Sequence, residues 1–190
     1  MTLLKLSAAA FVALILTNCV GYQADWRSSV DQKVAKLGYR NWIVIAEASF
    51  PAHSRKGVTQ VSSEAEIPVV MDYVLNAMES TQHVRPKVYL TRELHAVEND
   101  FAPGIDTLRE QIKESIHGHE PTILDQQSLL TLIESATQNF DVLVIRTPTA
   151  LPYSSIFLEL QPGYWDADSE TRLRDRIRRQ QMESLASPTP

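Results

Sequence analysis

The sequence predicts an α/β fold, a single layered domain in which helices flank a central β-sheet. The main observation is an alternation between segments with apolar residues at helical spacing and short, β-branched apolar runs typical of buried strands. The second is size, because 190 residues suffice for one domain with one hydrophobic core. The third is composition, because 44% hydrophobic and 22% charged residues are close to the globular average and exclude wholesale disorder.

Residues 1–18 are predicted to be an export signal peptide. Lys5 precedes an apolar run, Leu6–Leu16, which at about 1.5 Å per residue is too short to span a bilayer comfortably. Cys19 follows, in an order that resembles a bacterial lipoprotein signal, although Asn18 replaces the usual small residue. Two alternatives stay open: a membrane-anchored lipoprotein with Cys19 as its mature N-terminus, or a periplasmic protein released by ordinary cleavage. Because Cys19 is the only cysteine, an intramolecular disulfide is excluded.

The first half of the domain is predicted to hold two helices and one buried strand. Apolar residues at helical spacing predict a helix over Asp25–Leu37, which Gly38 ends. The continuous apolar run Trp42–Ala46 predicts a buried strand. A loop is expected over 52–63, and a second helix over Ile67–Met78.

The second half continues the alternation of helices and strands. A short strand is expected over Lys87–Thr91. Apolar spacing predicts helices over Asp106–Ile116 and Asp125–Gln138. The runs Asp141–Arg146 and Ile156–Leu160 predict two more strands.

The chain after Trp165 differs in composition from the domain, which we place at residues 25–165. Residues 166–190 are expected to form a charged, arginine-rich helix and a disordered tail. Acidic residues between the arginines favour a solvated surface helix, although the cluster would also suit acidic lipid or a partner. The net charge of −5 argues against a nucleic-acid partner.

Motifs that identify common enzyme classes are absent. The sequence has no G-x-S-x-G, P-loop, G-x-G-x-x-G or H-E-x-x-H motif, which removes the easily identified hydrolases, nucleotide binders and zinc proteases. His117 and His119 would need Glu120 or His95 to complete a metal site. Two histidines at this spacing are a weak indication, so we expect a polar loop there and no metal.

Three segments carry a resemblance to a known family. Ile45-Ala-Glu-Ala-Ser-Phe-Pro-Ala-His-Ser54, Leu132-Ile-Glu-Ser-Ala with its following strand, and Pro152-Tyr-Ser-Ser-Ile occur in order. Together they resemble the RbsD/FucU family of D-ribose pyranases and L-fucose mutarotases, over roughly residues 30–163. The resemblance implies an α/β fold, anomer or ring-form exchange of a free monosaccharide, no cofactor and assembly into homo-oligomers.

The resemblance also implies catalytic positions. The family's proton-donating histidine corresponds to Tyr39, and its sugar-binding aspartate corresponds to Glu47. Anomer exchange needs a positioned acid and base, and a tyrosine hydroxyl that titrates near ~10 is poorly matched to that task. His53, one residue past the Phe50-Pro51 break, is the candidate for a surviving acid/base or sugar-contacting group.

Further positions are implied for substrate binding. The family's Tyr-Gly-Asn triplet corresponds to Tyr153, Ser154 and Ser155, where the serine hydroxyl loses the paired donor and acceptor of an amide. A sugar-contacting arginine of the fucose mutarotases corresponds to Leu129, which cannot form hydrogen bonds. The alternative for Tyr153, Ser154 and Ser155 is a polar turn between two strands without a ligand role.

We therefore predict a mutarotase- or pyranase-like isomerase with weak or altered activity. The alternative is a non-catalytic carbohydrate-binding or structural relative, which the substitutions at Tyr39 and Leu129 and the export signal favour. A third hypothesis keeps the pocket but uses Glu47 and His53 as an acid/base pair for other chemistry. If Tyr39, Glu47, His53 and Tyr153 line one cavity, the site is retained.

Overall fold

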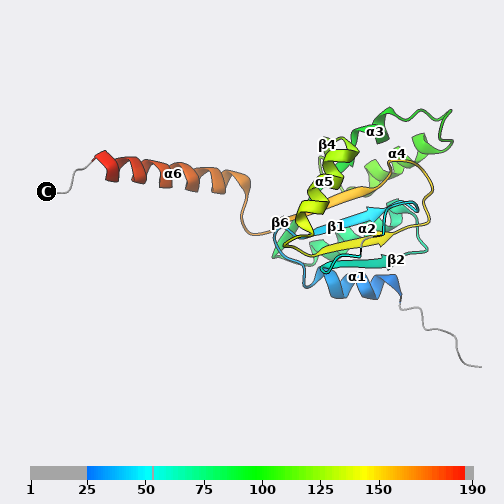
Figure 1. The fold of residues 1–190 in the computed structure, drawn as a ribbon, viewed down its shortest axis with the longest axis horizontal. Helices are drawn as coiled ribbons and strands as arrows, with labels where there is room; N and C mark the ends of the chain where they lie inside the picture. Colours follow the sequence, from blue (N-terminus) through cyan, green and yellow to red (C-terminus); the bar gives the residue numbers. More distant parts are fainter. Residues whose placement is uncertain (1–24, 53, 187–190) are drawn as a thin grey trace, which may run out of the picture.

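The computed structural model describes residues 25–52 and 54–186, and its architecture is the predicted α/β fold (Figure 1). The strands are β1 Trp42–Ala46, β2 Val58–Ser62, β3 Val84–Thr91, β4 Thr122–Leu124, β5 Val142–Arg146 and β6 Ile156–Pro162. The helices are α1 Trp26–Val34, α2 Ile67–Glu79, α3 Arg92–Ala96, α4 Ile105–Ser115, α5 Gln126–Ala136 and α6 Ala167–Ala186. The six strands form one sheet in the order β2-β5-β1-β6-β3-β4.

One antiparallel strand determines which loops meet. Strands β1 and β2 both pair in parallel with β5, and β3 pairs in parallel with β4. Strand β6 lies between β1 and β3 and runs antiparallel to both. The C-terminal ends of the five parallel strands therefore lie at the same edge of the sheet as the N-terminal end of β6. We call this the carboxyl edge, and the opposite one the amino edge.

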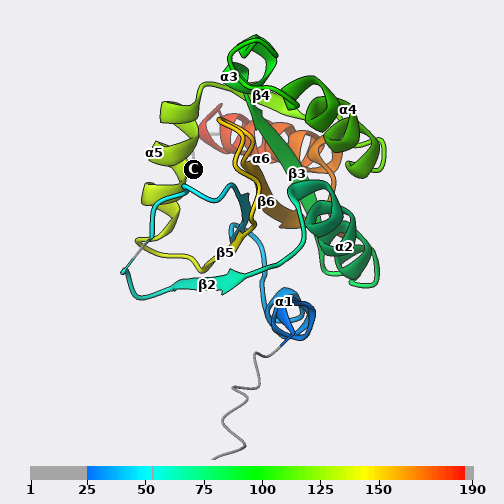
Figure 2. The same cartoon turned by 90° about the vertical axis from the view of Figure 1, so that its right-hand side faces the viewer.

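Helices cover both faces of the sheet. Helices α1, α2 and α4 lie against one face and α5 against the other (Figure 2). The larger core joins Trp26 and Val30 of α1 to the alternate residues Ile43 and Ile45 of β1. The smaller core packs Leu129 and its neighbours on α5 against the remaining β1 residues. Because β1 is buried on both faces, its continuous apolar run is explained.

Local signals account for the helix boundaries. Asp25 caps α1 by accepting from Arg27 N–H at 3.2 Å, and Asp125 caps α5 by accepting from Ser128 N–H at 2.8 Å. Pro68 lies in the first turn of α2, where a missing N–H costs nothing. The predicted helices and strands in these regions are confirmed to within a few residues.

Four elements differ from the prediction. The loop expected over 52–63 is wrong in part, because β2 occupies Val58–Ser62 and pairs with β5. Its mixed polar composition fits an edge strand with little burial. Strand β3 begins at Val84 rather than Lys87, and Pro86 is tolerated within it because β4 pairs only with Tyr89–Thr91. The short elements α3 and β4 were not predicted, since neither is long enough to show a period.

Helix α6 extends away from the body of the molecule, beyond the end of β6 (Figure 1). It covers most of the predicted charged segment. The predicted signal peptide, the lipidation candidate Cys19 and the predicted tail over 187–190 lie outside the described residues. Within residues 25–52 and 54–186, no helix has the length and apolarity needed to cross a bilayer.

Candidate functional site

Buried hydroxyl groups gather at the carboxyl edge. Of the eight buried polar side chains in the described part of the chain, six lie at strand ends or in the adjoining loops of this edge: Ser63, Thr91, Thr147, Thr149, Ser154 and Ser155. A buried hydroxyl without a partner would cost stability, so each is expected to take part in a hydrogen bond. These bonds hold the loops that surround Glu47.

Glu47 and the Ser154-Ser155 pair hold each other in place. Glu47 follows β1, and its backbone N–H donates to Ser155 Oγ at 3.1 Å. In return, the backbone N–H of Ser154 donates to Glu47 Oε2 at 3.1 Å. We call this pair of bonds the Glu47 latch. It joins the end of β1 to the start of β6, so the carboxylate has a fixed position.

The second oxygen of the Glu47 carboxylate faces the following loop. Ser49 Oγ donates to Glu47 Oε1 at 2.9 Å in an exposed position. The loop is held in turn by Arg146, at the end of β5, whose Nη2 donates to the carbonyl of Phe50 at 2.8 Å. A guanidinium group therefore lies at the same edge as the carboxylate, one strand away in the sheet.

Tyr153 has a strained backbone next to the latch. Its φ is 60°, in the left-handed region that a bulky side chain adopts at a cost of roughly 1–2 kcal/mol. Thr91, fully buried at the end of β3, donates from Oγ1 to the Tyr153 carbonyl at 2.8 Å. The bonds at Thr91 and Ser154 hold this conformation from both sides, and the tyrosine side chain remains 37% exposed. Strain of this kind is common at functional sites.

The loop before Tyr153 is attached to the sheet and to α2. Thr147 Oγ1 donates to the Ala46 carbonyl at 2.8 Å. Thr149 Oγ1 accepts from the Ile67 N–H at 3.1 Å and donates to the Glu66 carboxylate. Ala48 N–H donates to the Thr149 carbonyl at 2.9 Å. The loop after β1 and the loop before β6 are therefore bonded to the sheet and to the start of α2, and not only to each other.

The structure brings four of the proposed site residues together, namely Glu47, Tyr153, Ser154 and Ser155. It separates Tyr39 from them. Tyr39 precedes β1 at the amino edge, and five strand residues at about 3.3 Å each put roughly 16 Å between it and Glu47. It is 59% exposed, with the Arg40 guanidinium 5.6 Å from the ring centroid. Tyr39 and Glu47 of one chain therefore do not line a single cavity.

The remaining proposed positions do not add to this site. Leu129 is fully buried in the core between α5 and the sheet, so it contacts no substrate. His53 lies outside the described residues. The sequence interpretation missed Arg146 and Thr91. Each is a polar side chain at the end of a predicted strand, and this position was the signal in the sequence that could have identified them.

One histidine of the expected polar loop, His117, bridges two carboxylates of α2. His117 bonds to Asp72 through Nε2 at 2.8 Å and to Glu79 through Nδ1 at 3.2 Å. Both ring nitrogens must donate to make these two bonds, so the pair of carboxylates raises the pKa of His117 above its ordinary value. Within the described ranges, no three side chains of the metal-binding types gather as a metal site would require.

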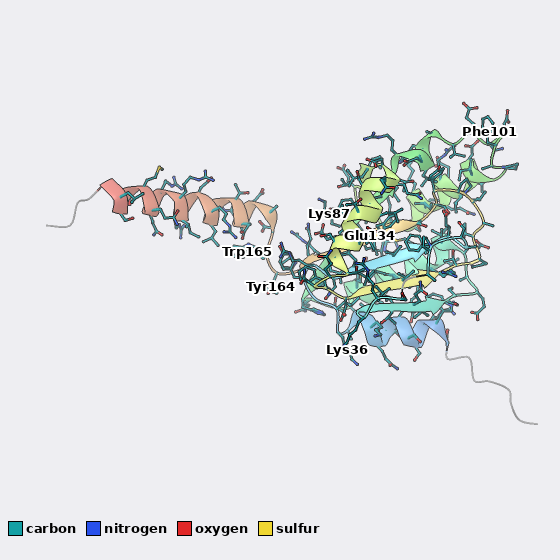
Figure 3. The ribbon with its side chains drawn as sticks, in the orientation of Figure 1. Lys36, Lys87, Phe101, Glu134, Tyr164 and Trp165 are labelled. Carbon is teal, nitrogen blue, oxygen red and sulfur yellow. The ribbon has the colours of Figure 1, made fainter. Side chains whose placement is uncertain are left out.

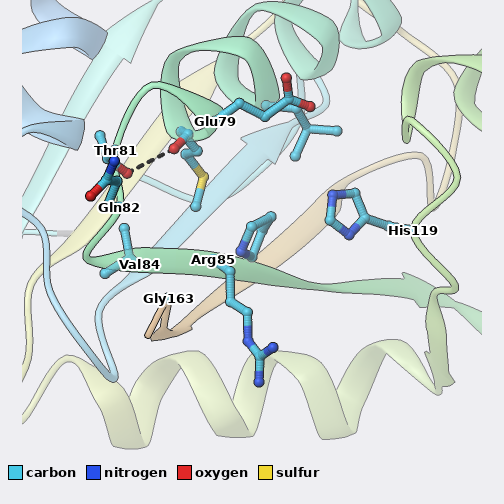
Figure 4. Close-up of a pocket in the computed structure, with 10 residues that line it drawn as sticks. Glu79, Thr81, Gln82, Val84, Arg85, His119 and Gly163 are labelled. Atoms are coloured by element: carbon cyan, nitrogen blue, oxygen red, sulfur yellow. Dashed lines mark hydrogen bonds between the residues drawn. The ribbon is translucent and has the colours of Figure 1, made fainter. Parts of the chain in front are cut away.

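A groove of about 340 Å³ lies at the other end of the molecule. It lies between the C-terminal end of α2 and the start of β3 (Figure 4). Its lining residues are Leu75, Met78, Glu79, Thr81, Gln82, Val84, Arg85, Pro86, His119 and Gly163. None of these belongs to the carboxyl edge, so this groove and the Glu47 latch are separate features.

Comparisons with known proteins agree with this fold. A family-level comparison matches residues 27–161 to the RbsD / FucU transport protein family. Bacillus subtilis RbsD complexed with D-ribose is similar in structure, with 22% identity and a TM-score of 0.50 over 73% of this chain and 94% of that one. A fucose mutarotase from Streptococcus pneumoniae, in complex with L-fucose, has 20% identity and a TM-score of 0.46 over 67% and 87%. FucU from Bifidobacterium longum has 18% identity and a TM-score of 0.48 over 70% and 92%. The comparison with curated protein sequences finds no match.

Proposed function

The chain belongs to the RbsD / FucU transport protein family, and from this premise we propose that it binds a free monosaccharide at the carboxyl edge and exchanges its anomers or ring forms. The solved relative from Bacillus subtilis is complexed with D-ribose, which suggests an aldose as the substrate class. The proposal assigns the sugar-facing role to Glu47 and Tyr153, and it needs no cofactor.

The observation that carries the proposal is the Glu47 latch. The Ser154 N–H and the Ser49 hydroxyl each occupy one carboxylate oxygen of Glu47, and each oxygen keeps a further lone pair. A carboxylate held in this way can accept hydrogen bonds from sugar hydroxyls without losing freedom of its own on binding. Ser154 and Ser155 are fully or nearly fully buried, so we assign them to positioning Glu47 rather than to sugar contact.

The proposed reaction is a proton exchange around one bond. Glu47 takes the proton of the anomeric hydroxyl, the bond between the anomeric carbon and the ring oxygen breaks, and water gives a proton to that oxygen. The open-chain aldehyde then rotates and recloses on its other face, with both proton transfers reversed. Atoms and charges balance, and Glu47 ends in its starting state.

A second candidate function is carbohydrate binding without catalysis. One observation favours it: Tyr39, at the position of the family's proton donor, lies at the amino edge and not beside Glu47 in the same chain. Under both candidates we propose that the protein is exported with residues 1–18 as its signal, followed either by lipid attachment at Cys19 or by release after ordinary cleavage.

Exchange spectroscopy by NMR on the anomers of D-ribose and L-fucose tests the proposal. We expect faster exchange with the unmodified protein, and a loss of at least tenfold with Glu47→Gln. The matched control is Glu110→Gln, an exposed carboxylate on α4 that pairs with Lys113 and has no bond to the Glu47 latch among the described residues. Saturable sugar binding without exchange would select the second candidate. Absence of both binding and exchange would refute the proposal.

A further inference from the structure

Helix α6 takes no part in the proposed sugar site. It begins after the segment matched to the family, which ends at residue 161. All side chains over residues 171–185 are exposed, and the helix projects from the body as a free arm (Figure 1). A helix of this length therefore receives no stabilising burial from its own chain.

The start of α6 is nevertheless built and oriented by the body. Arg85 of β3 donates to the Trp165 carbonyl at 3.3 Å, and Trp165 Nε1 donates to Glu170 at 2.8 Å. Asp166 caps the first turn by accepting from the Ser169 N–H at 2.6 Å. The direction in which the arm leaves the sheet is thus specified by hydrogen bonds.

The arm carries its unpaired cations on one face. Arg172, Arg176 and Arg179 recur at the spacing that places side chains on one side of a helix, and none forms an ion pair within the described residues. The other two arginines pair along the helix, Arg174 with Glu170 at 2.6 Å and Arg178 with Asp175 at 3.4 Å.

An apolar pair lies beside this cationic face. Leu173 and Ile177 are one turn apart and remain 39% and 37% exposed. At the start of the arm Tyr164 is 80% exposed, and Figure 3 places it with Trp165 between the body and α6. Exposed aromatic and apolar groups next to arginines are the composition of a protein interface.

The body offers a complementary surface. Residues 25–166 hold 12 Lys and Arg against 19 Asp and Glu, a net charge of −7, whereas residues 167–186 have five arginines against four acidic residues. The groove at the amino edge has a mainly apolar lining that includes Met78, Val84 and Pro86. Glu79 lines it on the same side of β3 as His119, with its carboxylate bonded to His117, and Arg85 lines it as well (Figure 4).

We propose that α6 is an exchanged arm that docks in the amino-edge groove of a second copy of this chain. Leu173 and Ile177 cover the apolar lining, and Arg172 and Arg176 face the acidic body of the partner around it. Gly163, just before the arm, also lines the groove, so each arm leaves its body beside that body's own groove, and a two-fold axis midway between Gly163 and Ile177 lets both arms dock reciprocally. At about 1.5 Å per residue, Ile177 lies about 15 Å along the arm, within reach of a neighbour's groove. The net charge of −7 on the body argues against an anionic lipid surface as the occupant.

Disulfide trapping between two chains tests the docking geometry. In a Cys19→Ser background, one chain carries Gln82→Cys at the groove and the other carries Ile177→Cys on the arm. We expect a cross-linked dimer on mild oxidation of the mixture. The matched control replaces Ile177→Cys by Met182→Cys, which lies on another side of α6 and is 57% exposed. A yield no higher than the control would overturn the proposal.

Sedimentation gives the second readout. Ile177→Asp should halve the mass of the assembly, whereas Met182→Asp should leave it unchanged. An unchanged mass with Ile177→Asp would contradict arm exchange, as would a Gln82–Ile177 disulfide that forms only within one chain carrying both cysteines. Binding of α6 to vesicles containing phosphatidylglycerol, abolished by the same substitution, would show that the arm serves a membrane instead. Sugar binding at Glu47 is a separate measurement, so the two proposals fail independently.

Discussion

The backbone N–H of Ser154 donates to the carboxylate of Glu47 at 3.1 Å, although 107 residues separate them in the sequence. This bond links the end of β1 to the start of the neighbouring antiparallel strand β6. It exists because β6 runs against the other strands and brings its N-terminal end to the carboxyl edge. The candidate site thus depends on sheet topology more than on any continuous motif.

Ser155→Ala should destabilise the protein through the latch. The Ser155 hydroxyl is 4% exposed and accepts the Glu47 N–H, so its removal leaves a part-buried donor without its partner. We expect a loss of about 1–3 kcal/mol in the free energy of unfolding. Urea titration measures it, with Ser49→Ala as a control at an exposed hydroxyl. Equal effects of the two substitutions would contradict a structural role for Ser155.

Because the backbone at Tyr153 is left-handed, a glycine variant should be more stable there than an alanine variant, the reverse of the usual order. With φ at 60°, Tyr153→Gly is expected to be more stable than Tyr153→Ala by about 1 kcal/mol, because only glycine adopts this conformation without strain. At Asn76, exposed on α2, the order should be the ordinary one, with glycine less stable by about 1 kcal/mol. Thermal unfolding of the four variants checks both orders. The same order at both positions would show that Tyr153 is not strained.

The His117 bridge should make stability depend on pH. Two carboxylates raise the folded-state pKa of His117, so the bridge contributes fully below the pKa of an unfolded histidine, about 6.5. That contribution is lost as pH rises through the raised folded-state pKa. The melting-temperature difference between the unmodified protein and His117→Gln should therefore be largest near about pH 6 and shrink at alkaline pH. The control Gln111→Asn, at an exposed side chain of α4 that does not titrate, should show no such trend. A difference that grows with pH would contradict the bridge.

Gly163→Ala should disturb the amino edge. A Cβ at Gly163 would lie 2.4 Å from the carbonyl oxygen of Gln82, a backbone atom that cannot move alone. We expect a loss of about 1–3 kcal/mol in the free energy of unfolding. Gly38→Ala is the control, because the nearest atom to its Cβ would be 3.8 Å away and its φ is ordinary. Chemical denaturation of both variants should separate them clearly, and similar values would mean that the close approach at Gly163 is not tight.

Much of the fold could be predicted because its signals are local. The run Trp42–Ala46 has no polar residue, and only a strand buried on both faces explains it. Strand β2 carries no such signal, since three of its five residues are polar and its pairing with β5 is non-local. Strand β4 has only three residues, too few for any pattern.

The candidate site was predictable in part for the same reason. Glu47 and Tyr153 could be found because each lies in a short stretch that resembles the family. Tyr39 precedes Glu47 by only eight residues, yet the strand between them places the two residues at opposite edges. The support from Thr91 could not be foreseen, because it depends on β3 and β6 being neighbours in the sheet.

The central claim, that Glu47 and its latch form a monosaccharide site, is tested most directly by a ¹⁵N NMR titration with D-ribose. The amide of Ser154 reports the site because it donates to the Glu47 carboxylate. The amide of Gly163, which donates to the His83 carbonyl at the amino edge, serves as the internal control. We predict a saturable shift of the Ser154 signal that Glu47→Gln removes, with the Gly163 signal unmoved. A shift confined to Gly163 and its groove, or a Ser154 shift that persists in Glu47→Gln, would contradict the account.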